Sequence, residues 1–394
     1  MANLRDRLKI IQNQKKNEIN KNEERHEARQ TPVDCSTGYS ALKALGWVDC
    51  GFKVLKREVI KDSPFNTEAA LPPSVSIIIH DLASLKFQGS LLQGSLLPEY
   101  SDFLFFDLET TGLSGGAGTL AFLAAFGRIV KDGHADKLRI TQYLLLDYPG
   151  ENDFLDAVLK EFTKDCVTVT YNGKCFDSQI LKTRCLMNRI NPPVYYHADL
   201  LHPARRLWKN VIQDCSQSSI ETRILGIDRS GDIPGALAPD IWFEFLKTGG
   251  TDRLTGICDH NISDISGLAA ILAAMVMIAE DPFNVKYDYD TGRLALYWRI
   301  FCRRYEHGDL QVTGDKLLLF AAQKDIKSLP NIKAAVFRAL AIDCERRQKN
   351  RALALEYVKK GMLLTEAGEN WHNEFERRKE RLERKLSVKN SVDS

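Results

Sequence analysis

Two carboxylates directly follow a short apolar run in this chain. The segment "FLFFDLETTG" (103–112) places four large apolar residues ahead of Asp107 and Glu109. The run predicts a buried strand, and residues two positions apart in a strand point to the same face. Asp107 and Glu109 should therefore converge beside a core. Left unpaired there, they would repel each other and one would take up a proton, whereas a divalent cation would balance both charges.

The residues after Asp107 and Glu109 help to show whether this pair marks a functional site. Acids at a strand end are common on protein surfaces, so an Asp-x-Glu pair alone has little specificity. Here the pair leads into "TTGLSGGAG" (110–118), a Gly-rich stretch that would let a substrate backbone approach closely. The stretch lacks the Gly-Lys-Ser/Thr ending of a Walker A loop, which argues against nucleotide binding of that kind.

Two further acids occur downstream at positions that could complete a metal site. Asp177 begins a predicted helix after "YNGKCF", where its structural alternative is a helix N-cap. The segment "ICDHNISDISGLAAILAAM" (257–275) places His260 and Asp264 four residues apart, on one face of a predicted helix. Alone, His260 would be an ordinary partly buried histidine. The four acids together form a much rarer constellation.

The elements around these acids predict an α/β fold. Strand-like stretches at 103–109, 119–130 and 138–146, separated by turn signals, predict an antiparallel meander. There follow a helix over 151–162, a strand over 166–171, a helix from about 177 to 188, a short strand over 194–200, and helices up to about 280. This order is that of the ribonuclease H-like fold, a mixed sheet flanked by helices.

The remaining sequence divides the chain into three predicted parts. Residues 1–98 form a polar N-terminal segment with a short strand-containing extension, residues 99–281 the α/β domain, and residues 282–394 an all-α helical-hairpin region. In the first part, 1–31 are polar and charged, 46–60 suggest a strand or hairpin, and 75–83 a strand or a helix start. In the last, 334–364 resemble one tetratricopeptide unit, and the charged tail 374–389 predicts a solvated helix.

Composition sets broad limits on function. The 394 residues are 44% apolar and carry a formal net charge of +2, so any basic binding surface must be local. No run of 18 apolar residues suggests a membrane span, and the first thirty residues lack the apolar core of a signal peptide. The nine cysteines are scattered without a Cys-x-x-Cys pair, which fits free thiols and gives no zinc-site spacing. We expect a cytoplasmic protein without a membrane partner.

Three segments carry a family resemblance. "FFDLETTGL", "YNGKCFD" and "HNISDISGLAA" resemble, in order, the three motifs of the DEDD 3′–5′ exonuclease superfamily within the ribonuclease H-like fold. The closer resemblance is to bacterial YprB-like predicted exonucleases, in which a tetratricopeptide-like helical region follows the nuclease domain. Connecting segments over 197–209, 225–235 and 238–249 also resemble that group. The similarity covers roughly residues 99–280.

This resemblance implies hydrolysis of nucleic-acid phosphodiester bonds by a two-metal mechanism with Mg²⁺ or Mn²⁺. Asp107 would bridge both ions, Glu109 and Asp264 would complete the site of the attacking water, and Asp177 would support the second ion. The sequence departs from the superfamily pattern at the residue that would act as general base and take a proton from the attacking water. The superfamily's third motif has a tyrosine three residues clear of the final Asp or a histidine four residues clear, and His260 stands at the tyrosine's spacing. Whether His260 reaches the site is left open by the sequence.

Several residues are weaker candidates for contact with nucleic acid. Thr110 and Leu113 could line the path of the terminal nucleotide, and Asn172 and Lys174 could touch phosphate. Asn172 could instead only fix the turn after its strand.

The segment "HPARRLWK" offers a second set of phosphate contacts. Arg205, Arg206 and Lys209 stand beside Trp208, but a solvated helix face with Trp208 in the core is an equal alternative. Asp199, at a strand end, is expected to cap the next helix.

Three classes of function follow. The first is a metal-dependent 3′–5′ exonuclease, the second a structure-selective endonuclease on the same fold. The third is a non-catalytic nucleic-acid-binding or scaffold protein whose C-terminal helices recruit a protein partner. The sequence does not distinguish DNA from RNA, because recognition of the 2′-hydroxyl depends on loop positions.

Overall fold

A single mixed sheet forms the centre of the computed structural model, which describes residues 36–83, 97–112, 118–163, 166–304, 308–323 and 329–390. The polar segment 1–31 lies outside these residues. The sheet has seven strands in the order β1-β2-β5-β4-β3-β6-β7. Their bounds are β1 Val48–Gly51, β2 Val54–Asp62, β3 Phe103–Thr110, β4 Ala121–Asp132, β5 Ala135–Leu145, β6 Val167–Thr170 and β7 Tyr196–Asp199.

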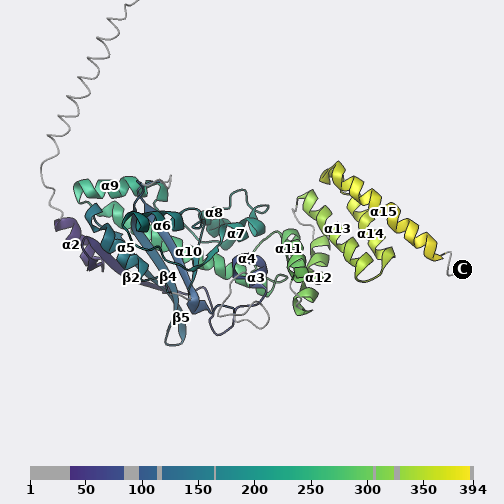
Figure 1. The fold of residues 1–394 in the computed structure, drawn as a ribbon, viewed down its shortest axis with the longest axis horizontal. Coiled ribbons are helices and arrows are strands. Elements are labelled where there is room, and N and C mark those ends of the chain that lie inside the picture. Colours follow the sequence, from purple (N-terminus) through teal and green to yellow (C-terminus); the bar gives the residue numbers. More distant parts are fainter. Residues whose placement is uncertain are drawn as a thin grey trace, which may run out of the picture.

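Strands β3, β4 and β5 form the predicted antiparallel meander, and β6 and β7 continue the sheet parallel to β3. Helices cover both faces of the sheet (Figure 1). The predicted fold class, a mixed sheet flanked by helices with an all-α C-terminal region, is confirmed.

The N-terminal extension contributes two strands to this sheet. Residues 46–60, predicted as a strand or hairpin, form β1 and β2, and β2 pairs with β5 from Val54↔Leu145 to Asp62↔Lys137. The sheet therefore begins well before residue 99, where we placed the start of the α/β domain. Residues 75–83 adopt the helical alternative as two short turns, α3 Val75–Ile78 and α4 His80–Ala83.

Alternating side chains of β3 enter two cores on opposite faces of the sheet. Phe103 and Phe105 belong to the core beneath helix α10, Asp252–Glu280. Leu104 and Phe106 belong to the core with α5 Glu151–Leu159, α6 Asp177–Met187 and α9 Ala238–Thr248. Because side chains alternate along a strand, the acids at 107 and 109 continue the face of Phe103 and Phe105 and lie under α10.

Helix α10 is the main helix on this face. By length and composition its 29 residues could cross a membrane, yet 72% of its most apolar window is buried inside the protein. Its contact with the sheet is close, since a Cβ atom on Gly127 of β4 would lie 2.6 Å from the Ile265 side chain. A buried core helix meets the same criteria of length and composition.

Shorter helices connect these elements. They are α2 Ser36–Ala44, α7 Leu201–Trp208 and α8 Gln217–Ile220, which continues into a π-helical segment, Glu221–Leu225; 3₁₀ turns lie at Tyr100–Asp102, Tyr148–Gly150, Gly235–Leu237 and Thr365–Ala367.

Five helices form the described part of the C-terminal region, which extends away from the sheet (Figure 1). Neighbouring helices pack closely where a glycine meets a ring, as Gly314 does with Trp298 and Gly361 with Phe375. A tetratricopeptide-like arrangement stays a prediction. The helices are α11 Thr291–Arg304, α12 Gly308–Gln323, α13 Pro330–Arg346, α14 Arg351–Met362 and α15 Glu369–Asn390.

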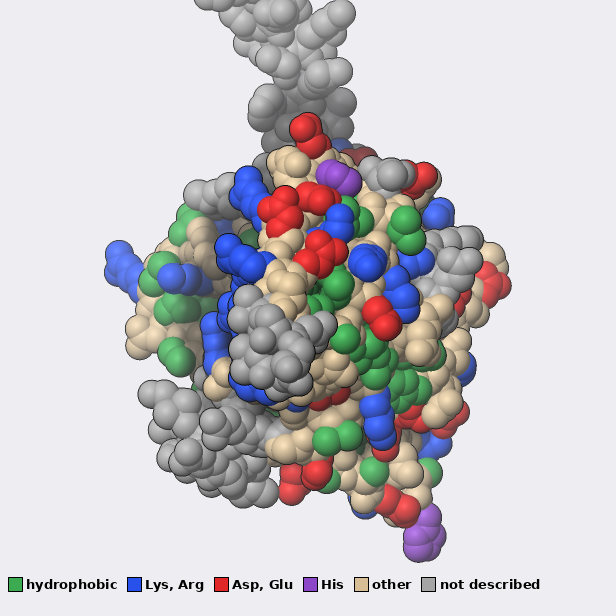
Figure 2. Space-filling model, turned by 90° about the vertical axis from the view of Figure 1, so that its right-hand side faces the viewer, with side chains coloured by type: hydrophobic (Ala, Val, Ile, Leu, Met, Phe, Trp, Pro, Cys, Tyr) green, Lys and Arg blue, Asp and Glu red, His purple; other side chains and the backbone are tan. Residues whose placement is uncertain are grey.

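The charged tail forms most of α15. Its Phe375 and Leu382 are buried, so one face packs inward, while Arg381 and Lys385 pair with the buried Glu345 of α13. Figure 2, seen from this end of the molecule, shows Lys and Arg side chains interspersed with Asp and Glu. The predicted solvated helix is therefore partly a packing helix.

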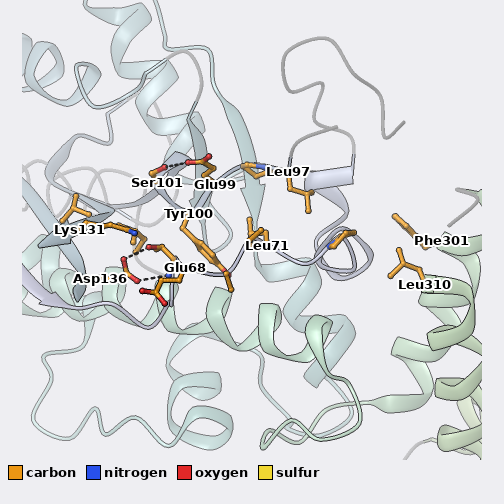
Figure 3. A pocket seen from close by; sticks show the side chains of 17 residues that line it. Glu68, Leu71, Leu97, Glu99, Tyr100, Ser101, Lys131, Asp136, Phe301 and Leu310 are labelled. Carbon is orange, nitrogen blue, oxygen red and sulfur yellow. Dashed lines mark hydrogen bonds between the residues drawn. The ribbon is translucent and has the colours of Figure 1, made fainter. Parts of the chain in front are cut away.

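A cavity of about 790 Å³ lies where the sheet region meets the C-terminal helices (Figure 3). Leu71, Leu97 and Tyr100 line it from one side, and Phe301 of α11 and Leu310 of α12 from the other. Its polar rim includes Glu68, Lys131 and Asp136. Its lining is mainly apolar, with these charges at the edge.

Candidate active site

Four acids from three elements meet in a cleft of about 310 Å³ at the end of β3. Asp107 and Glu109 come from β3, Asp177 is the first residue of α6, and Asp264 comes from α10. Glu109 is 9% exposed and Asp177 is 8% exposed. The structure thus brings together the four acids that the sequence singled out. The other residues of the cleft lining are Leu108, Thr110, Tyr171, Asn172, Phe176, Gly235, Pro239 and His260.

A tight turn after β6 positions Asp177. Asn172 has a left-handed backbone with φ of 66°, and the Asp199 carboxylate accepts hydrogen bonds from the backbone N–H groups of Asn172 at 2.8 Å and Lys174 at 3.1 Å. The same carboxylate accepts from the N–H of Leu201 at 3.1 Å, at the start of α7. Asp199 is not the N-cap residue of α7, which is Leu200, but its carboxylate binds the first N–H of that helix and holds the turn that leads to Asp177.

Burial and nearby carboxylates disfavour the charged forms of Asp107, Glu109 and Asp177. Burial, together with Asp264 and Asp177 nearby, raises the pKa of Asp107 and of Glu109 well above the ordinary range. Burial also raises the pKa of Asp177 to about 7. Hard divalent cations prefer carboxylate oxygens and would offset this repulsion, so the donor set fits Mg²⁺ or Mn²⁺.

His260 reaches the cleft from the tyrosine-like spacing. Its Nε2 lies 3.2 Å from Oδ2 of Asp264 and 4.0 Å from Oε1 of Glu109, and its Nδ1 lies 2.9 Å from Oδ1 of Asp232. Glu109, His260 and Asp264 each offer a ligand atom within 4.8 Å of one another, a candidate metal-binding cluster. Gly235 leaves room for the ring, because a Cβ there would lie 2.9 Å from Nε2.

An arginine balances charge on the α10 side of the cleft. Arg229 lies 2.6 Å from Asp264, 2.7 Å from Asp232 and 3.0 Å from Glu221. Burial outweighs the nearby arginine and raises the pKa of Glu221, which is fully buried. Gly267 makes space for this carboxylate, since a Cβ there would lie 1.7 Å from Oε1 of Glu221.

Some of the predicted nucleic-acid contacts lie in the cleft and others do not. Thr110 and Asn172 line the cleft, and the Thr110 hydroxyl donates to the carbonyl of Gly112 at 2.9 Å. The ammonium group of Lys174 lies 2.7 Å from Asp81, and Lys174 is not part of the cleft lining. Leu113 lies outside the described residues.

Arg205 and Arg206 lie on α7 and are not part of the cleft lining. Arg206 stacks over the Tyr297 ring at 5.3 Å, while Arg205 is exposed. Trp208 is fully buried and donates to the carbonyl of Asp288 at 3.0 Å. The arrangement has the buried tryptophan and solvated face that we considered as the alternative to a phosphate patch.

Sequence reasoning missed several residues around the acids. Asn261 donates to Oδ2 of Asp107 at 2.7 Å, and it stands next to His260 as a polar residue on a face that packs on the sheet. Arg229 and Asp232 lie in "LGIDRSGDIPG", which we had interpreted only as a connecting segment. Their charges, opposite in sign and three residues apart, were the available signal.

Comparison with known proteins agrees with this architecture. Residues 104–276 match the RNase_H superfamily, and the fold and the acidic cleft agree with a ribonuclease H-like domain. Over 178 residues the chain is 39% identical to the uncharacterized protein YprB of Bacillus subtilis strain 168. That alignment covers 44% of this chain and 42% of YprB, so the similarity spans less than half of either protein.

Proposed function

We propose that this protein is a metal-dependent nuclease, and more specifically a 3′–5′ exonuclease that uses two divalent ions. One observation carries the proposal: four acids, three of them with a raised pKa, converge in a single open cleft. The match of residues 104–276 to the RNase_H superfamily supports the reaction class. The 3′–5′ polarity and the two-ion arrangement rest on the motif resemblance.

Asp107, Glu109, Asp177 and Asp264 would hold Mg²⁺ or Mn²⁺. When bound, such ions supply an activated water and neutralise charge on the leaving oxygen. His260 would take a proton at Nε2; this role is supported by its Nδ1, which lies 2.9 Å from Oδ1 of Asp232. An imidazole held in this way presents its second nitrogen to the cleft in a fixed orientation.

The cleft lining combines apolar and polar groups that could contact a nucleotide. Tyr171, Phe176 and Pro239 give it an apolar wall, while Thr110 and Asn172 provide polar groups. Aromatic and apolar side chains stack on bases irrespective of sequence, which fits non-specific digestion. Both DNA and RNA are candidate substrates, and a protein partner for the C-terminal helices and a cytoplasmic location stay predictions.

The experiment is an incubation of the purified protein with end-labelled single-stranded and duplex DNA and RNA, in Mg²⁺, in Mn²⁺ and in chelator. We expect metal-dependent laddering from the 3′ end. Asp107→Asn should abolish it, and Asp156→Asn, at an exposed acid of α5, should not. Internal cuts would replace the exonuclease with an endonuclease. No cleavage, with nucleic acid bound alike by the wild type and Asp107→Asn, would indicate a non-catalytic binding protein.

A further inference from the structure

A chain of hydrogen bonds connects strand β2 to the first acid of the cleft. Arg57 of β2 donates through Nε and Nη2 to Oε1 of Gln142 in β5, at 3.2 and 2.9 Å. Gln142 donates from Nε2 to Oδ1 of Asn261 at 3.0 Å, and Asn261 donates from Nδ2 to Oδ2 of Asp107 at 2.7 Å. Gln142 and Asn261 are both fully buried.

The donor and acceptor roles along this series of hydrogen bonds are determined by Arg57 and by the backbone carbonyl of Cys258. A guanidinium group can only donate, so Gln142 must present its oxygen to Arg57. The carbonyl of Cys258 can only accept, and it receives the second bond from Nε2 of Gln142 at 2.8 Å. The amide of Gln142 therefore has one allowed orientation. Because it presents N–H to Asn261, Asn261 must turn its oxygen toward Gln142 and its NH₂ group toward Asp107.

Arg57 is itself held firmly. Its guanidinium lies over the Trp47 ring at 4.9 Å and 3.1 Å from Oδ1 of Asp259, and its side chain is 11% exposed. Arg57, the first residue in this series of hydrogen bonds, thus belongs to the hairpin of β1 and β2, outside the residues that match the RNase_H superfamily.

We propose that Arg57, Gln142 and Asn261 are positioning residues that orient Asp107 for a metal ion. This inference rests on the proposed function. The donor from Asn261 takes up one lone pair of Oδ2 and leaves Oδ1 for the ion. Groups that hydrogen-bond to metal ligands commonly change metal affinity or activity 10–100-fold when they are replaced.

The test is a calorimetric titration of the full chain with Mn²⁺ in the absence of nucleic acid. Asn261→Leu should weaken Mn²⁺ binding by about 10-fold or more. Arg57→Met removes one of the two groups that fix the Gln142 amide and leaves the Cys258 carbonyl, so it should weaken Mn²⁺ binding by a smaller factor, roughly 3–10-fold. Arg57→Lys keeps a group that only donates and should restore binding to within about twofold of the wild type.

Arg128→Met is the matched control. Arg128 is also a half-buried strand arginine, paired with Glu161 at 3.7 Å, but it is not part of the chain to Asp107. It should leave Mn²⁺ affinity unchanged. Circular dichroism reports whether each variant folds; if Asn261→Leu does not, the comparison of Arg57→Met with Arg57→Lys decides alone. Equal weakening by these two variants would indicate lost packing and overturn the proposal, as would wild-type affinity in all of them.

Cleavage assays on the same variants separate this inference from the nuclease proposal. Weaker Mn²⁺ binding in Asn261→Leu, with no cleavage by the wild type, would support the positioning role and refute the nuclease. Metal-dependent cleavage by the wild type, with unaltered Mn²⁺ binding in every variant, would support the nuclease proposal and refute the positioning role. A wild-type protein that binds no Mn²⁺ would refute both.

Discussion

The acidic cleft at the end of β3 and the cavity between the sheet region and the C-terminal helices differ in size and in the charge of their linings. The cavity is the larger, at about 790 Å³ against 310 Å³, and its lining is mainly apolar. The cleft is smaller and gathers four acids, of which Asp107, Glu109 and Asp177 have a raised pKa while Asp264 pairs with Arg229. Since volume alone does not create reactivity, the concentration of buried carboxylates with a raised pKa makes the cleft the candidate functional site.

The largest contrast concerns cleavage. Asp107→Asn should reduce nuclease activity by roughly 1,000-fold, because it removes the acid shared by the proposed ions. Glu68→Gln, on the rim of the cavity, should leave cleavage within about twofold of the wild type. Rates on an end-labelled substrate measure both. Comparable losses in the two variants would remove the distinction between the regions.

Stability should respond with opposite signs in the two regions. Folding raises the pKa of Asp177 to about 7, so Asp177→Asn removes a disfavoured charge and should raise the free energy of unfolding of the metal-free protein by roughly 2–4 kcal/mol at pH 8. Leu71→Ala, at a buried residue of the cavity wall, should lower it by about 2–4 kcal/mol. Urea unfolding in chelator gives both values, and a destabilised Asp177→Asn protein would contradict the electrostatic account.

The cleft should also set the pH dependence of stability. Acids with a raised native pKa hold more protons in the folded than in the unfolded state, so stability falls as pH rises. For Asp177 this fall spans about pH 4 to 7, and Asp107 and Glu109 add to it because burial raises their pKa as well. Saturating Mn²⁺ should flatten the fall, whereas Leu71→Ala should keep the slope of the wild type. Thermal melts across this pH range, in chelator and in Mn²⁺, measure the effect. The same dependence of melting temperature on pH in chelator and in Mn²⁺ would argue against a metal at these acids.

The smallest expected effect is at the cavity. Val130→Leu adds one methylene to its lining and should stabilise the protein by at most about 0.8 kcal/mol. The increase in melting temperature on adding Mn²⁺ should be the same as in the wild type. A change in that increase would mean that the two regions are coupled.

Local patterns were enough to predict much of this molecule. Alternation and turn signals predicted the meander of β3, β4 and β5, and the spacing of the acids predicted that Asp107 and Glu109 would share a face. Four acids could be chosen because each lies in or at the start of an element whose type the sequence shows: Asp107 and Glu109 in a strand, Asp177 at a helix start and Asp264 in a helix. The strand from 166 and the helix from 177 were recognisable in the same way.

Long-range contacts could not be predicted. The membership of β2 in the sheet depends on pairing with β5, roughly eighty residues away, and no local signal specifies such a partner. Asn261 meets Gln142 across 119 positions of sequence. Lys174, a candidate phosphate contact, instead pairs with Asp81 because the fold places that acid beside it.

The pairing of β2 with β5 has a practical consequence for any shortened form of the protein. A version starting at residue 99 would match the recognisable motifs but would leave β5 as an open sheet edge along Ala135–Leu145. Unpaired edges recruit strands from other molecules, so such a fragment should self-associate. In the full chain the N-terminal hairpin covers this edge, because β2 pairs with β5 over residues 137–145.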